Sequence, residues 1–392
     1  MPNELLAFLS LDYAGLILAL PLLAVGLWLV LRHRWRRTAK GAGAQRKTGR
    51  RWPGVLLLIA GGVLAGGSIK HLSDIAQAWR DFPPPGRFVT VDGTSIHVLA
   101  QGPKSARPTL VWFAGGHVPG LAIDHLHRRV RGNFRSVLID RPGTGWSGPG
   151  KFPRSTVREA QEMWAALEAA GEKGPFVLIG HSFGGLLAAN MARSHPERVK
   201  SLVLLDATPP DTIIYGPKLG GLAKMRSDAL WGGLFALVGL DYQKIAGDAP
   251  TGADRLDRII ARELGQSYAA SKALGRSPAF AFTSYSIYSE LSPTGLADVA
   301  WDTVVYDGEL SPMPVFLMAP RDLLEFGKLP EAANAKQREA ARMARFFAST
   351  RERYLASSTN AQRIYAPAGT GHNFPYEAPD LVVATVMRAA AQ

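Results

Sequence analysis

A short stretch in the middle of the chain constrains the fold more than any other. Residues 176–179 form an apolar, β-rich run that passes directly into the Gly-His-Ser-Phe-Gly motif of residues 180–184, and a helical pattern follows at once. A serine in a tight turn between a strand and a helix is the setting that a G-x-S-x-G motif requires. The glycines allow close backbone approach, and the helix N-terminus presents free N–H groups to negative charge. Ser182 is therefore a candidate nucleophile.

Strands alternate with helical stretches on both sides of this motif. A hairpin is expected over residues 87–101, with Asp92 and Gly93 in its turn. Further strands are expected at 109–114, 136–140, 200–206, 313–320 and 363–369. This alternation predicts an α/β fold, with an eight-stranded, mostly parallel sheet and helices on both faces. The pattern breaks over residues 207–300, where we expect a mobile helical lid.

Two uncharged apolar runs precede this region. Residues 13–31 are long enough to span a bilayer, and residues 52–68 form a shorter, glycine-rich run. Small residues such as Gly61 and Gly67 could let the two helices pack closely. The runs predict two transmembrane helices in a hairpin. The expected domains are a membrane hairpin at 1–70, a connector at 71–86, the first part of the α/β core at 87–206, the lid at 207–300 and the second part of the core at 301–392.

Charge is concentrated between the two apolar runs. The linker 32–51 contains nine of the 45 Lys and Arg residues of the chain and no acidic residue, and the remaining 36 nearly match the 32 acidic residues. Basic loops beside spanning helices stay on the cytoplasmic side. We therefore expect the following domain on the outer or periplasmic side, with the protein in a bacterial inner membrane. A nucleic-acid-binding protein would spread its positive charge over a folded face, so no nucleic-acid partner is expected.

Three candidate catalytic residues follow strand ends in the order Ser182, Asp322, His372. This order is typical of one class of serine hydrolases. From about Phe88 to Ala390 the chain resembles the serine-dependent α/β-hydrolase superfamily, of the lipase and esterase kind. The matching pieces are residues 140–147, 180–185, 195–199 leading into 202–206, the strand ending near Asp322, and Gly371-His372 followed by 377–379. Branches with epoxide hydrolase or dehalogenase activity place Asp where this chain has Ser182.

The resemblance implies a role for each residue. His372 would take the proton of the Ser182 hydroxyl, and Asp322 would orient the imidazole. Asp206 is a second candidate for the acid, because some relatives place it after the sixth strand. The oxyanion would be bound by the backbone N–H groups of Phe183 and His117.

The function predicted from these residues is cleavage of a lipophilic or lipid-derived ester by a membrane-anchored serine hydrolase. No cofactor or metal is implied, the expected partners are a small-molecule ester and the lipid bilayer, and the oligomeric state is open. The alternatives are an acyltransferase, a cofactor-free haloperoxidase-like enzyme, or a catalytically silent binding or scaffold protein.

Gly116 is the alternative oxyanion donor to His117. His125 and His127 are expected on the surface, and residues 140–147 in a structural turn beside the site.

Overall fold

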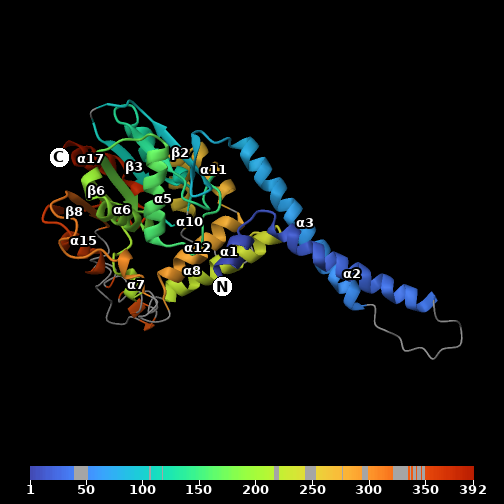
Figure 1. Cartoon of the computed structure of the whole chain (residues 1–392). Coiled ribbons are helices and arrows are strands. Elements are labelled where there is room, and N and C mark those ends of the chain that lie inside the picture. The colour runs from blue at the N-terminus through green and yellow to red at the C-terminus, as the bar shows by residue number, and fades with distance from the viewer. Residues whose placement is uncertain are drawn as a thin grey trace.

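The computed structural model consists of an α/β domain from which two long helices project (Figure 1). The residues that it describes are 1–38, 52–105, 107–116, 118–215, 220–242, 253–275, 277–293, 299–320, 334–335, 337–338, 341, 346 and 349–392. Asp322, His117 and most of the basic linker lie outside these residues.

One eight-stranded sheet forms the centre of the domain, in the order β1-β2-β4-β3-β5-β6-β7-β8. The strands are β1 (Arg87–Val91), β2 (Thr94–Gln101), β3 (Thr109–Phe113), β4 (Ser136–Ile139), β5 (Phe176–His181), β6 (Val199–Leu205), β7 (Val315–Ala319) and β8 (Ala361–Tyr365). Strand β2 pairs antiparallel with β1 and with β4, and the other pairs are parallel. The expected eight-stranded, mostly parallel sheet is confirmed.

Neighbouring residues of the central strands point to opposite faces of the sheet, as the strand period of two requires. In β3, Val111 and Phe113 join one buried cluster, whereas Leu110 and Trp112 join the other. All four are almost fully buried, because helices cover both faces. Helices α5 (Thr156–Ala169) and α6 (Phe183–Ser194) cover the first face, and α17 (Pro379–Ala391) covers the second (Figure 1). Helix α4 (Asp124–Val130) also packs on the second face.

Five described helices lie between β6 and β7. They are α7 (Thr212–Tyr215), α8 (Gly220–Leu237), α10 (Ala253–Leu264), α11 (Gln266–Leu274) and α12 (Pro278–Glu290). Helices α8 and α12 pack side by side, and Gly233 of α8 has no room for a side chain, because an added Cβ would lie 2.7 Å from the Phe282 ring. The short η5 (Trp301–Thr303) also precedes β7, and the other short elements are η1 (Gly120–Ile123), η2 (Pro196–Arg198), α15 (Arg353–Ala356) and α16 (Phe374–Glu377).

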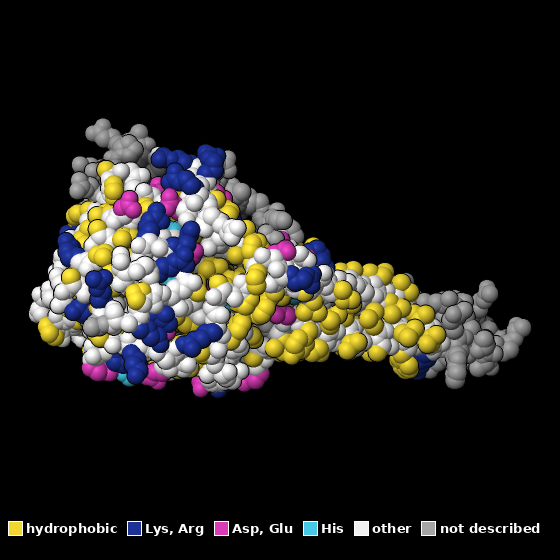
Figure 2. Space-filling view, turned by 90° about the horizontal axis from the view of Figure 1, so that it is seen from above, with side chains coloured by type: hydrophobic (Ala, Val, Ile, Leu, Met, Phe, Trp, Pro, Cys, Tyr) yellow, Lys and Arg dark blue, Asp and Glu magenta, His cyan; other side chains and the backbone are white. Residues whose placement is uncertain are grey.

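The projecting pair consists of α2 (Ala14–Thr38) and α3 (Trp52–Asp81), preceded by the short α1 (Asn3–Leu9). Both long helices contain a stretch long and apolar enough to cross a membrane, and hydrophobic side chains cover the projection (Figure 2). The two helices approach each other closely at Gly26 and Gly54, where an added Cβ on either residue would lie 2.9 Å from the carbonyl oxygen of the other. Of the glycines expected to pack, Gly61 contacts Leu23 of α2, whereas Gly67 instead contacts the domain.

Helix α3 differs from the expected division between a hairpin and a separate connector at residues 71–86. It continues from Trp52 to Asp81 without a break, so most of the expected connector is the last part of this same helix. Nothing between Ser68 and Asp81 disfavours helix, and the prolines from Pro83 onward explain why it ends there. The last strand also ends earlier than expected, at Tyr365, because a turn containing Pro367 and Gly369 follows.

Candidate active site

The backbone at Ser182 is strained. Its φ is 53° and its ψ is −123°, a conformation that a residue with a side chain rarely adopts. Such strain costs on the order of 1–3 kcal/mol and persists only where the surroundings impose it. Here the Ser182 N–H donates to the Leu205 carbonyl at 3.0 Å, and the Ser182 carbonyl accepts from Gly185 N and Thr208 N, each at 2.9 Å.

The two glycines of the motif are required for the turn. A Cβ on Gly180 would lie 2.1 Å from the Gly184 carbonyl oxygen, and one on Gly184 would lie 2.4 Å from the Phe113 carbonyl oxygen. Both contacts are with backbone, which cannot move aside. The strand, the turn and the helix therefore pack closely only with glycine at these positions, as the sequence predicted.

His372 forms its side-chain hydrogen bond with Asp206. His372 Nδ1 lies 2.6 Å from Asp206 Oδ2, and the Asp206 side chain is 2% exposed against 50% for His372. Asp206 directly follows β6, has a φ of 44°, and its N–H donates to the Met318 carbonyl of the neighbouring strand at 2.8 Å. A carboxylate at Nδ1 leaves Nε2 as the basic nitrogen of the neutral imidazole. The residue brought to His372 is thus the second candidate from the sequence.

The other oxygen of Asp206 faces an arginine. Arg351 Nη1 lies 2.6 Å from Asp206 Oδ1, and both side chains are largely buried. Arg351 Nε also points at the Ala207 carbonyl, at 3.4 Å. Burial lowers the pKa of Arg351, and the charge of Asp206 opposes this shift. Sequence reasoning missed Arg351, because 145 residues separate it from Asp206 and no local motif surrounds it.

A second histidine supports the loop that carries His372. His181 Nε2 lies 2.9 Å from the His372 carbonyl oxygen, and the two rings are 4.7 Å apart between centroids. Burial lowers the pKa of His181 to about 4. His181 is therefore neutral near pH 7 and can donate this bond without adding a positive charge beside His372.

Phe183, one of the two expected oxyanion donors, and Gly116, the alternative to the other, both contact a buried arginine. The N–H of Phe183 belongs to the first turn of α6. Arg141 donates from Nη2 to the Gly116 carbonyl, and its guanidinium carbon is 5.3 Å from the centroid of the Phe183 ring. Arg141 Nη1 lies 3.7 Å from Glu159 Oε2. Arg141 thus contacts both walls of the expected oxyanion site, a role that the sequence did not reveal.

Burial lowers the pKa of Arg141, whereas the nearby carboxylate of Glu159 raises it. An arginine remains charged even after a substantial downward shift. The expected oxyanion site therefore has a fixed positive charge beside it.

The turn over residues 140–147 is structural, as expected. Asp140 accepts from Gly120 N at 2.6 Å and Trp146 N at 3.1 Å, and its Oδ2 lies 3.0 Å from His97 Nδ1. These bonds hold the loop after β3 and the turn after β4 together at the same edge of the sheet. The Arg141 side chain is positioned by this turn.

The expectation that His125 and His127 lie on the surface is wrong. Both are fully buried. His125 Nε2 lies 2.9 Å from the Pro375 carbonyl oxygen, and His127 Nδ1 lies 2.8 Å from Ser136 Oγ. Burial lowers the pKa of each to about 4. Within the described part of the chain, no three carboxylate or imidazole groups come together as a metal site.

Apolar side chains from α8 and α12 cover the residue after Ser182. Phe183 and Leu186 of α6 form one buried cluster with Ile287 of α12 and the following Leu291, and Leu222 of α8 packs against it. Helices of the expected lid region thus contact the elbow directly.

The fold agrees with comparisons to known proteins. Residues 112–222 match the sequence family described as alpha/beta hydrolase fold. Among solved structures, an enol-lactonase from Burkholderia xenovorans is 16% identical with a TM-score of 0.51, and the alignment covers 78% of this chain and 100% of that one. An epoxide hydrolase from Bacillus megaterium is 13% identical with a TM-score of 0.52, over 78% and 100% of the chains. The chain is a protein of the α/β-hydrolase fold.

Curated relatives match over shorter stretches. A 1-acylglycerol-3-phosphate O-acyltransferase from Arabidopsis thaliana is 33% identical over 135 residues, which are 31% of this chain and 32% of the relative. The uncharacterized protein YbdG from Bacillus subtilis is 26% identical over 144 residues, which are 36% and 43% of the two chains. The chain therefore matches less than half the length of these relatives.

Proposed function

We propose that this protein is a membrane-anchored serine hydrolase that cleaves an ester with an apolar acyl part. The observation that carries the proposal is the pairing of His372 with the buried Asp206, at the same sheet edge as the strained Ser182. A serine, a histidine and a carboxylate at one sheet edge form the set of groups needed for acyl transfer. Asp206 takes the role that the sequence favoured for Asp322.

The reaction would proceed in two steps. The Ser182 oxygen attacks the ester carbonyl while its proton passes to His372 Nε2, and Asp206 stabilises the resulting imidazolium. The oxyanion is bound by the Phe183 N–H and a second N–H from residues 116–117. The bond to the leaving alcohol breaks as His372 returns the proton to it. Water then attacks the acyl-enzyme with His372 as base, and the acid product and Ser182 are released.

The membrane-anchored part of the proposal is supported by α2 and α3, since each contains a stretch that could cross a bilayer. With two spans and the basic linker in the cytoplasm, the catalytic domain would lie on the outer side. An acyl-group acceptor other than water is the second candidate, which the named acyltransferase among the relatives favours.

A fluorophosphonate probe tests the enzyme proposal on the full chain in its membrane. The wild type should be labelled, and Ser182→Ala should lose all labelling. Equal labelling of the two proteins, or none of the wild type, contradicts the proposal. A series of p-nitrophenyl esters of increasing chain length, with and without an added alcohol, would then separate hydrolysis from acyl transfer.

A further inference from the structure

Helix α8 connects the candidate active site with the base of the projecting helices (Figure 1). Near its N-terminus, Leu222 packs against the cluster that contains Phe183. At its C-terminal end, the Leu237 carbonyl accepts a hydrogen bond from Ser68 Oγ of α3 at 2.8 Å. The next residue, Val238, lies very close to Gly67 of α3. A Cβ added to Gly67 would be 2.1 Å from the Val238 carbonyl oxygen. The end of α8 is therefore fixed against α3.

The sequence of α3 locates the membrane boundary next to this contact. The helix has no charged residue from Trp52 to Ile69, and the first charge is Lys70. Eighteen residues at 1.5 Å each give about 27 Å, close to the hydrocarbon thickness of a bilayer. The apolar run of α2 begins just after Asp12, so Asp12 marks the same boundary for that helix. His71 Nε2 of α3 lies 3.2 Å from Asp12 Oδ1. Leu237 of α8 is therefore within about one helical turn of the boundary.

The part of α8 nearest this boundary exposes large apolar side chains. Trp231 is 47% exposed and Leu234 is 36% exposed, and their spacing of three places them on one face of the helix. Leu240, just beyond the helix, is 50% exposed. Residues 229–240 contain no charged side chain. Tryptophan is enriched at the boundary between lipid and water, where its ring is partly in contact with lipid.

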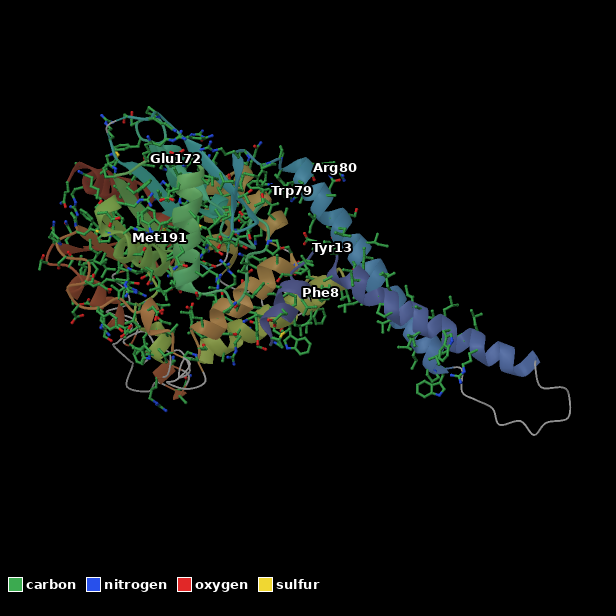
Figure 3. The ribbon with its side chains drawn as sticks, viewed as in Figure 1. Phe8, Tyr13, Trp79, Arg80, Glu172 and Met191 are labelled. Carbon is green, nitrogen blue, oxygen red and sulfur yellow. The ribbon has the colours of Figure 1, made fainter. Side chains whose placement is uncertain are left out.

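Helix α1 contributes to the same region. Its Leu6 and Leu9 are buried in one cluster with Leu237 of α8 and Phe282 of α12, whereas Leu5 is exposed. Phe8 and Tyr13 lie where the projecting helices leave the domain (Figure 3). Helices α1, α8 and α12 thus form an apolar base around the emerging helices.

We propose that the exposed face formed by Trp231, Leu234 and Leu240 lies in the headgroup region of the bilayer that α2 and α3 cross. The occupant of this face is a leaflet of phospholipid. Because α8 also reaches the cluster around Phe183, a lipophilic acyl chain enters the site from the lipid phase along α8 and α12. This inference rests on the proposed membrane anchoring and names the source of the substrate.

Depth measurements with single cysteines test the contact, and the absence of native cysteine simplifies them. Trp231→Cys and Leu234→Cys would be labelled with an environment-sensitive fluorophore in the full chain, reconstituted in vesicles that contain acyl-chain spin-labelled phosphatidylcholine. Val63→Cys in the span is the positive control. Trp301→Cys, which replaces an equally exposed tryptophan on η5, is the negative control.

We expect quenching at positions 231 and 234 to reach at least half of that at position 63, with little at position 301. Quenching at 63 but not at 231 or 234 overturns the inference. Blue-shifted emission at positions 231 and 234 without quenching by the lipid would indicate that a protein, such as a second copy of the chain, covers this face. That result also overturns the inference. If position 63 is not quenched, the proposed anchoring and this inference both fail.

A kinetic test addresses substrate entry. The double variant Trp231→Glu/Leu234→Glu should hydrolyse a long-chain ester dissolved in vesicles at least fivefold more slowly, and water-soluble p-nitrophenyl acetate at an unchanged rate. Trp301→Glu should change neither rate. An equal loss on both substrates, or none on either, contradicts entry from the lipid. Fluorophosphonate labelling of Ser182 in the double variant shows separately whether the catalytic residues remain competent.

Discussion

Arg351 and His372 bind opposite oxygens of the Asp206 carboxylate. Arg351 Nη1 lies 2.6 Å from Oδ1, and His372 Nδ1 lies 2.6 Å from Oδ2. A buried carboxylate with one partner would leave the other oxygen without compensation, which is costly. The ion pair with Arg351 offsets part of that cost by placing a positive charge against Oδ1. The arginine also competes with the imidazolium for the same negative charge.

Removal of Arg351 should therefore change both the rate and its pH dependence. We expect Arg351→Met to lower kcat/KM about tenfold, because Asp206 loses a fixed orientation and a charge partner. The acid limb of the pH–rate profile should move to higher pH, since the imidazolium no longer shares the carboxylate with a second cation. Arg351→Lys should recover part of both effects. An unchanged profile with reduced thermal stability would show that Arg351 is only structural.

The identity of the acid is tested by matched substitutions. Asp206→Asn should lower kcat about 10⁴-fold, as loss of the carboxylate does in a Ser-His-Asp triad. Asp322→Asn should leave kcat within about threefold of wild type. Steady-state kinetics on a short p-nitrophenyl ester, with circular dichroism as a control for folding, distinguish the two. The opposite pattern would restore Asp322 as the acid.

Arg141 should affect kcat more than KM. It holds the Gly116 carbonyl and stacks on Phe183, so its loss should displace an oxyanion donor. Removal of such a donor costs about 10²–10³ in rate, and we expect about 10²-fold for Arg141→Met. Arg154→Met is a control, because Arg154 pairs with the same buried Glu159 without a contact to the oxyanion loop. Equal kinetic losses in both variants would contradict a positioning role for Arg141.

Acid should destabilise the domain below about pH 6.5. His125, His127 and His181 have folded-state pKa values of about 4, so unfolding takes up protons as the pH falls from 6.5 toward 4. Burial raises the pKa of Glu290 to about 7, so between pH 4.5 and 7 unfolding releases a proton from this carboxyl group. That release cancels about one of the three protons that the histidines take up. The net slope is roughly 2–3 kcal/mol per pH unit near pH 5.

Thermal unfolding at a series of pH values measures this slope. His127→Gln should reduce it, because one of the three protons is no longer taken up. A slope unchanged in that variant would show that His127 is not a source of the acid sensitivity.

Membrane orientation can be read from two cysteine substitutions. Thr48→Cys lies in the basic linker, and Thr359→Cys lies in an exposed turn before β8. In intact cells, a membrane-impermeant thiol reagent should label position 359 and not position 48, since the basic linker should stay in the cytoplasm. Permeabilised cells, in which both positions should react, are the control. Labelling of 48 alone would invert the topology.

The sequence predicted the part of the site that is encoded locally. Ser182 and its glycines belong to one strand–turn–helix segment, and His372 follows the last strand. Sequence position favoured Asp322 as the acid and left Asp206 as the second candidate. The contact between Asp206, which directly follows β6, and His372 comes from tertiary packing over 166 residues, which no local motif encodes.

Contacts between distant segments were not predictable. Arg141 and Arg351 act through partners far away in the sequence, and no periodicity marks such residues. His125 and His127 were expected to be exposed because residues two apart on a helix face different sides. Helix α4 is only seven residues long and packs between the sheet and the segment around Pro375, so both sides are covered.

The uninterrupted path of α3 has a kinetic consequence. One helix runs from within the proposed span to Asp81, and β1 begins six residues later. A catalytic domain on such a rigid stem cannot sample the surrounding volume as one on a flexible tether would. With the proposed anchoring, its height above the lipid would be set, and its encounters with substrate would occur by lateral diffusion in the plane of the membrane. Turnover should then follow the mole fraction of substrate in the lipid, and diluting that substrate with inert lipid should slow the enzyme even at constant bulk concentration.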